Sequence, residues 1–92
     1  MNQGEVNQAV LEAARRLQHE QGLLWFSHMM LFDEVNAHLE GDAPAVSAVV
    51  RATYYLRQDR WIHILRPGNF HYHPDHIRFR LAGFKPQSAL EE

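Results

Sequence analysis

The chain has 92 residues, which is enough for one domain with a small hydrophobic core but not for a second module. Hydrophobic residues make up 46% of it and include five Phe, three Tyr and two Trp, so the composition indicates a folded domain and excludes a disordered one. There is no cysteine, which excludes disulfides and thiolate zinc sites, and the formal net charge is −2.

A first helix is predicted over residues 5–21, because apolar residues recur there at helical spacing. Its apolar stripe consists of Val6, Val10, Ala13 and Leu17. Gly22 is placed to cap the C-terminal end of this helix. Residues 1–4 are expected to form an N-terminal tail. The short apolar run LLWF, residues 23–26, suits a small strand or a buried connector.

Two more helices are predicted in the middle of the chain. Ser27 is placed to cap a second helix that runs to about Leu39. Gly41 ends that helix, and Asp42 with Pro44 opens a third, because proline is tolerated in a first turn. The third helix is expected to bury one line of residues, Val46, Val49, Val50, Thr53 and Leu56.

After Arg60 the apolar residues alternate with polar ones, which predicts two strands. The residues expected to face the core are Ile62, Ile64, Ile77, Phe79 and Leu81. The segment RPGNFHYHPD joins the two strands as the tip of a hairpin. The sequence therefore predicts an α+β domain over residues 5–83, with a C-terminal tail over residues 84–92.

The order of helix, short apolar run, helix, helix and hairpin resembles a winged helix-turn-helix domain. LFDEVNAHL, residues 31–39, is similar to the first helix of such a motif. VSAVVRATYYLRQDRWI, residues 46–62, is similar to the recognition helix that runs into the first wing strand. The intervening EGDAPA is longer than the tight turn usual in the motif. The resemblance implies three helices plus a C-terminal β-hairpin wing.

The same resemblance implies DNA binding, with the recognition helix, about residues 44–58, in the major groove and the wing, residues 66–75, on the backbone or an adjacent groove. The charge distribution agrees with a polyanionic partner. Residues 44–86 carry six arginines and one lysine against two acidic residues, whereas residues 1–43 carry two arginines against seven acidic residues. We therefore predict a transcriptional regulator that binds double-stranded DNA, expected as a homodimer because one such domain covers only a short half-site.

Side chains suited to base edges and phosphates are predicted on the third helix, the wing and the last strand. The predicted DNA contacts are Ser47, Arg51, Tyr55, Gln58, Arg66, Asn69, His71, His73, Arg78 and Arg80. Arg51 is the strongest of these candidates, because no acidic residue lies three or four positions away from it. Of the neighbouring Tyr54 and Tyr55, one is expected to pack inward.

The alternative function is a winged helix that binds a protein partner and no DNA. The negative net charge favours it. So do the aromatic pairs Tyr54-Tyr55 and Trp25-Phe26, because exposed aromatic residues together with arginine are typical of protein interfaces.

The segment HYHPDH, residues 71–76, reads H-x-H-x-D-H and resembles the zinc-binding pattern of the metallo-β-lactamase family. A zinc site would require His71, His73 and His76 to converge. That family needs a longer chain with further ligands spread along it, and a second strand follows His76 here. We therefore predict a polar wing tip with no metal and no cofactor, and a structural zinc ion stays the alternative.

No catalytic constellation is predicted, so we expect a protein that is not an enzyme. Ser27, His28 and Asp33 lie on one predicted helix, where capping and surface polarity explain them. Asp33 and Glu34 are interpreted as an exposed acidic pair near the N-terminus of that helix. No apolar run is long enough to cross a membrane, and MNQGEVNQ lacks a secretion-signal pattern, so we expect a cytoplasmic protein.

Overall fold

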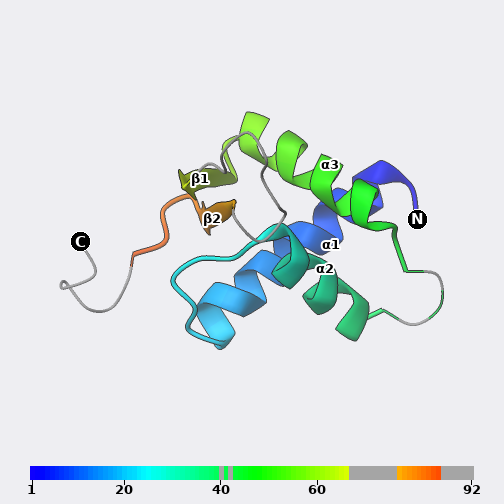
Figure 1. Cartoon of the computed structure of the whole chain (residues 1–92), viewed down its shortest axis with the longest axis horizontal. Coiled ribbons are helices and arrows are strands. Elements are labelled where there is room, and N and C mark those ends of the chain that lie inside the picture. The colour runs from blue at the N-terminus through cyan, green and yellow to red at the C-terminus, as the bar shows by residue number, and fades with distance from the viewer. Residues whose placement is uncertain (40, 42, 67–76, 86–92) are drawn as a thin grey trace.

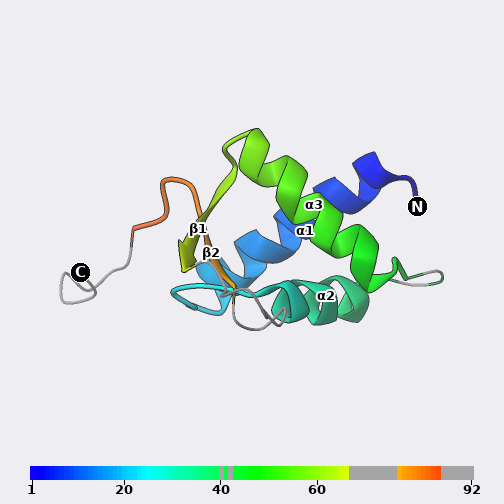
Figure 2. The same cartoon turned by 45° about the horizontal axis from the view of Figure 1, so that its top comes forward.

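The computed structural model describes residues 1–39, 41, 43–66 and 77–85 of the chain. In these residues three helices and a two-stranded antiparallel sheet form an α+β fold, the predicted class (Figure 1). The elements are α1 (Gln3–Arg15), the π-helical turn η1 (Arg16–Glu20), α2 (His28–Ala37), α3 (Val46–Gln58), β1 (Ile62–Arg66) and β2 (Arg78–Leu81). Figure 2 shows α3 crossing α1, with α2 running below this pair.

α1 begins at Gln3 instead of the predicted residue 5, because Asn2 caps it. The Glu5 N–H donates to the Asn2 side-chain oxygen at 2.8 Å, and the Asn2 N–H donates to the Glu5 carboxylate at 2.9 Å. This reciprocal pair is a capping box, which satisfies backbone donors that the first helical turn leaves open. Gln3 therefore belongs to the helix and not to a tail.

The end of this helical segment agrees with the predicted cap at Gly22. Gly22 has φ 74°, a left-handed conformation that glycine adopts without steric cost. The next N–H, of Leu23, donates to the Leu17 carbonyl oxygen at 3.0 Å and satisfies one of the carbonyls at the helix end. The chain then reverses into the connector that leads to α2.

α2 begins where the sequence predicts. The Ser27 side chain accepts a hydrogen bond from the Met30 N–H at 3.3 Å, as an N-cap serine does. The helix ends at Ala37, before the predicted Leu39, and Leu39 still packs against the core as a half-buried residue.

α3 begins at Val46, later than the predicted opening at Asp42 and Pro44. Ala45 is the N-cap residue, with an extended backbone at ψ 156° and no side-chain cap, so Pro44 lies outside the first turn. The buried stripe of α3 consists of Val49, Ala52, Thr53 and Leu56. Val46 was predicted to lie in the core but is 36% exposed, since it stands at the very start of the helix, before this stripe.

β1 and β2 pair with Ile62 opposite Leu81 and Ile64 opposite Phe79, and the register shifts after Ile64. The predicted alternation is confirmed, because Ile62, Phe79 and Leu81 are buried and Ile64 is half-buried. The run LLWF, residues 23–26, was expected to be a small strand or a buried connector, and it is a connector with a single β-bridge. Phe26 and Phe79 exchange two backbone hydrogen bonds there, at 3.0 and 2.8 Å.

The core lies between the helices and the inner face of the hairpin. All four stripe residues predicted for the first helix are buried in it, three on α1 and Leu17 on η1. Phe84, from the predicted C-terminal tail, packs on the same core with its ring centroid 5.7 Å from that of His19. Arg66, the first residue of the predicted hairpin tip (residues 66–75), belongs to β1. The rest of that tip and the chain after Lys85 lie outside the described residues.

One buried amide joins three segments of the fold. Gln18 is only 2% exposed, and its Nε2 donates to the Leu23 carbonyl oxygen at 3.1 Å. Its Oε1 accepts a hydrogen bond from the Leu81 N–H at 2.7 Å. The side chain therefore holds the connector and the end of β2 against η1, and both ends of the amide are paired, as a buried polar group requires.

Candidate nucleic-acid interface

The outer side of α3 carries a line of four exposed polar residues, called here the α3 ridge. Its members, Ser47, Arg51, Tyr54 and Gln58, follow at i, i+4, i+7 and i+11 and so share one face, opposite the buried stripe. α3 contains no acidic residue between its first and last positions. Of the predicted contacts, Ser47, Arg51 and Gln58 are therefore brought together on one exposed face.

Arg51 is held by a partner that sequence reasoning missed. Its Nη1 donates to the Gln3 Oε1 at 3.2 Å, and the Gln3 Nε2 donates to the Ala48 carbonyl oxygen at 3.1 Å. Gln3 was assigned to a tail, so its position beside α3 was not visible in the local pattern. Because an amide is neutral, this contact orients the guanidinium without compensating its charge.

Tyr54 belongs to the α3 ridge, and Tyr55 lies next to it on α3. Tyr54 is 48% and Tyr55 39% exposed, so the prediction that one of them packs inward is wrong. Their rings are in edge-to-face contact at a centroid distance of 5.7 Å. Each ring thus gains an aromatic contact while it remains exposed to solvent. The Gln58 Nε2 donates to the Tyr54 hydroxyl at 2.7 Å, and this bond fixes the orientation of the Gln58 amide.

A buried polar contact sets α3 against the start of α2. The Thr53 hydroxyl donates to the Val50 carbonyl oxygen at 2.6 Å and lies 3.0 Å from the His28 Nε2. Since the Thr53 hydroxyl has one proton, which it gives to Val50, the His28 Nε2 is the donor in the second contact. His28 is 4% exposed, so its interpretation as surface polarity was wrong. Its partner lies 25 residues away in sequence, and no local pattern reveals that.

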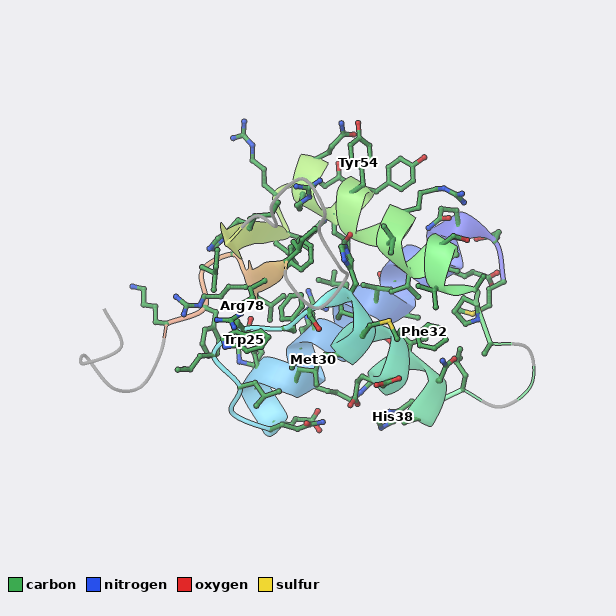
Figure 3. All side chains as sticks on the ribbon, in the orientation of Figure 1. Trp25, Met30, Phe32, His38, Tyr54 and Arg78 are labelled. Atoms are coloured by element: carbon green, nitrogen blue, oxygen red, sulfur yellow. The ribbon has the colours of Figure 1, made fainter. Side chains whose placement is uncertain are left out.

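Arg78 and Arg80 lie against the connector that precedes α2. The Arg78 guanidinium stands 4.3 Å from the centroid of the Trp25 ring, in a cation–π contact. The Arg80 Nε donates to the Leu24 carbonyl oxygen at 2.9 Å. Figure 3 shows Arg78 and Trp25 together, well separated from Tyr54 on α3. These two predicted contacts are therefore not part of the α3 ridge.

The remaining predicted contacts belong to the predicted wing. The Arg66 side chain and residues Asn69, His71 and His73 lie outside the part of the chain that the structure describes. Two further arginines near the C-terminal end of α3 differ in exposure. Arg60 is exposed after the end of α3, whereas Arg57 is half-buried between α3 and the hairpin.

Of the two acidic residues of α2, Glu34 is paired with cationic side chains away from the ridge. The Glu34 carboxylate, 10% exposed, accepts hydrogen bonds from the Arg16 Nε at 2.8 Å and the Gln21 Nε2 at 3.0 Å, and lies 3.2 Å from the His38 Nδ1. The predicted exposed acidic pair is thus half wrong, since Asp33 is exposed but Glu34 is not. Figure 3 places His38 on the side of the molecule opposite Tyr54.

The environment of Glu34 changes its acidity. Burial raises the pKa of this carboxyl, but the hydrogen bonds from Arg16 and Gln21 and the charges of Arg16 and His38 outweigh burial. The pKa therefore lies below its ordinary value of 4.5. A carboxyl with a lowered pKa stabilises the folded state at neutral pH, and this contribution is lost as the pH falls through the folded-state pKa.

We expect Glu34→Gln to lower the free energy of unfolding by about 1 kcal/mol at pH 7, because Arg16 loses its ionic partner at a partly buried site. The difference in unfolding free energy between the variant and the unchanged protein should decrease once the pH falls below 4.5, the ordinary pKa of the carboxyl. It should vanish at still lower pH. Urea unfolding at several pH values measures it. Asp33→Asn, at the exposed neighbouring position, is the matched control. A difference that stays constant from neutral to strongly acidic pH would contradict the assignment.

Comparisons of the chain with protein-family models, with curated proteins and with solved structures found no match.

Two further searches cover the described residues alone. None of the helices there is both long and apolar enough to span a membrane. In the same residues, no group of three or more His, Cys, Asp or Glu side chains is arranged to hold a metal ion. The predicted zinc alternative involves His71, His73 and His76, which lie outside that part of the chain.

Proposed function

We propose that the protein is a winged-helix transcriptional regulator that binds double-stranded DNA by inserting α3 into the major groove. The observation that carries this proposal is the α3 ridge, an exposed line of hydrogen-bonding side chains on a helix without acidic residues. Support for the winged-helix assignment comes from the element order and from the bridge between Phe26 and Phe79, which joins the connector to the last strand.

The length of the α3 ridge fits the major groove of DNA. From Ser47 to Gln58 it extends about 16 Å along the axis, at about 1.5 Å per residue. That length corresponds to roughly five base pairs at about 3.4 Å each. The major groove is about 12 Å wide and admits one α-helix. α1 and α2 pack against α3, and the four ridge residues remain exposed.

The side chains of the ridge have complementary tasks in this proposal. Arg51 donates to Gln3 through Nη1, which leaves the opposite edge of its guanidinium for a guanine. Gln58 uses one amide hydrogen on Tyr54, which leaves its oxygen and second hydrogen for an adenine edge. Ser47 and the Tyr54 hydroxyl can donate to phosphate oxygens. The internal bonds reduce the entropy lost on binding.

Recognition of a full site requires a second copy of the chain. One helix of this length reads a half-site only, so we propose a homodimer on a two-fold related operator. In this arrangement the wing, residues 66–75, contacts the backbone or the adjacent groove.

A second candidate function is a protein-interaction module, and the exposed aromatic side chains favour it. Tyr54, Tyr55 and Trp61 are each more than a third exposed, and the Arg15 guanidinium lies 6.0 Å from the centroid of the Trp61 ring. Aromatic residues with arginine are enriched at interface hot spots. If the protein does not bind DNA, protein binding is the function that explains these exposed side chains better.

Arg51→Ala is expected to weaken binding to a site selected from random duplexes by about 1–3 kcal/mol, while binding to mixed-sequence DNA changes little. The reason is that a base-edge contact is lost, whereas phosphate contacts release counterions whatever the sequence. Fluorescence anisotropy with both duplexes, over a series of salt concentrations, measures the two affinities.

The matched control is Arg15→Ala, which removes the same charge from an exposed position on α1. It should leave the preference for the selected site unchanged. Mixed-sequence duplex that binds no tighter than roughly millimolar at low salt would contradict DNA binding altogether, since non-specific affinities of DNA-binding proteins are roughly 10⁻⁴–10⁻⁶ M even at physiological salt.

A further inference from the structure

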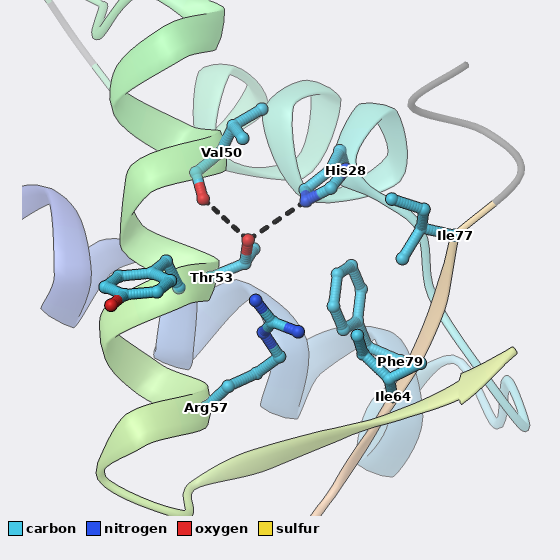
Figure 4. Close-up of a pocket in the computed structure, with 8 residues that line it drawn as sticks. His28, Val50, Thr53, Arg57, Ile64, Ile77 and Phe79 are labelled. Carbon is cyan, nitrogen blue, oxygen red and sulfur yellow. Dashed lines mark hydrogen bonds between the residues drawn. The ribbon is translucent and has the colours of Figure 1, made fainter. Parts of the chain in front are cut away.

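A pocket of about 200 Å³ lies beside the α3 ridge, between α3, the first residue of α2 and the hairpin (Figure 4). Its walls are mostly apolar and come from Val50 on α3, Ile64 on β1, Ile77 just before β2 and Phe79 on β2. A cavity of about 150 Å³ is already large enough for benzene. The pocket can therefore hold a molecule with one small ring or a short aliphatic chain.

Arg57 supplies the charge of this pocket. Its side chain leaves α3 and its guanidinium points toward the Phe79 ring in Figure 4. The Arg57 Nε is shielded from solvent and has no hydrogen-bond acceptor among the described residues. A buried donor without a partner is costly, and the cost is larger for a charged group. An acceptor from a ligand would remove this cost.

The lining determines the charge and shape of such a ligand. Arg57 is the one permanently charged residue among the described residues of the pocket wall, and no acidic residue stands beside it there. A single guanidinium with apolar neighbours compensates one negative charge but not the two of a phosphate. The Nε edge of a guanidinium presents two parallel N–H groups, which match the two oxygens of a carboxylate.

Thr53 and Tyr54 on the wall already have partners within the protein, although the Tyr54 hydroxyl keeps its own hydrogen. The Thr53 hydroxyl donates to the Val50 carbonyl and accepts from His28, and the Tyr54 hydroxyl accepts from Gln58. Arg57 is therefore the group that would recognise a ligand, and the apolar walls would take its body. We propose that this pocket binds a small monocarboxylate with an apolar ring or chain, of the size of benzoate.

Benzoate is the probe, and benzamide is its neutral counterpart of the same shape. In ¹⁵N-resolved NMR titrations of the whole chain, benzoate should shift the signals of Arg57, Thr53 and Phe79 with a dissociation constant of roughly a millimolar, as expected for a ligand with so few atoms. Tyr54 and Gln58 should shift too, because Tyr54 belongs to both the pocket and the α3 ridge. Benzamide should bind at least about tenfold more weakly.

Different variants test the charge of Arg57 and the volume of the pocket. Arg57→Gln should weaken benzoate binding at least about tenfold, and Arg57→Lys should give an intermediate loss, because an ammonium cannot donate two parallel bonds. Val50→Phe should abolish binding by filling the pocket while Arg57 remains. Arg60→Gln, an exposed arginine three residues along, is the control and should bind benzoate as the unchanged chain does. The spread of chemical shifts in the ¹⁵N spectrum of each variant shows whether it is folded.

Three results would overturn the proposal. They are the absence of saturable shifts up to roughly 10 mM benzoate, where so small a ligand should have saturated, equal binding of benzamide, and unchanged benzoate binding in a folded Arg57→Gln variant. None of these measurements involves DNA, so the outcome is independent of the proposed function of α3.

Discussion

Replacing Gln18 with leucine should lower the free energy of unfolding by about 2–4 kcal/mol. The leucine fills a similar volume but leaves two buried backbone groups without partners, the Leu23 carbonyl oxygen and the Leu81 N–H. Each buried group left unpaired costs about 1–3 kcal/mol, and the added apolar contact of leucine offsets part of the sum. Urea unfolding followed by tryptophan fluorescence measures the change.

Gln8→Leu is the control for this variant, because Gln8 lies exposed on α1 and bonds only to Glu12, at 3.1 Å, among the described residues. Its effect should stay within about 0.5 kcal/mol, as for most surface substitutions. If Gln18→Leu were equally mild, the connector and β2 would not depend on the Gln18 amide, and the account of how the hairpin is held would fail.

Phe79→Ala should destabilise the protein by about 3–5 kcal/mol, the range for truncating a buried aromatic residue. Phe79 is 1% exposed, and its ring stands 6.0 Å from that of Phe26 and 4.9 Å from that of His28. Its backbone also holds the bridge to Phe26. Truncation therefore opens a cavity where the connector, α2 and β2 meet, and surrounding atoms can fill it only partly.

Phe84→Ala provides the comparison, because Phe84 packs on the same core but is only half-buried. Its cost should be smaller, about 1–2 kcal/mol, since less apolar surface returns to water. Thermal or urea unfolding of both variants gives the ranking. If Phe84→Ala lowered the free energy of unfolding as much as Phe79→Ala, or more, the position assigned to Phe79 at the centre of the core would be contradicted.

Features that depend on neighbours in sequence could be predicted. The α1 stripe, the Ser27 cap, the Gly22 cap and the alternation of β1 and β2 all follow from local spacing or local backbone geometry, and each is confirmed. Three of the four ridge positions were predicted for the same reason, since they face away from the buried stripe.

Features that depend on distant partners could not be predicted. The Gln18 amide meets Leu81, 63 residues away, and Gln3 meets Arg51, 48 residues away. Arg78 was expected to face solvent by strand alternation, but its guanidinium turns onto the ring of Trp25. In each case a long polar side chain finds its partner through the tertiary fold, and hydrophobic periodicity carries no information about that choice.

The most direct measurement of the α3 hypothesis is a ¹⁵N NMR titration of the whole chain with duplex DNA at low salt. We expect the largest shifts at Ser47, Arg51, Tyr54 and Gln58, and none at His38 on the opposite side of the molecule (Figure 3). These shifts should weaken as salt is added, because counterion release drives the binding. A titration that leaves the α3 ridge unshifted, or that shifts the His38 side instead, would contradict the account.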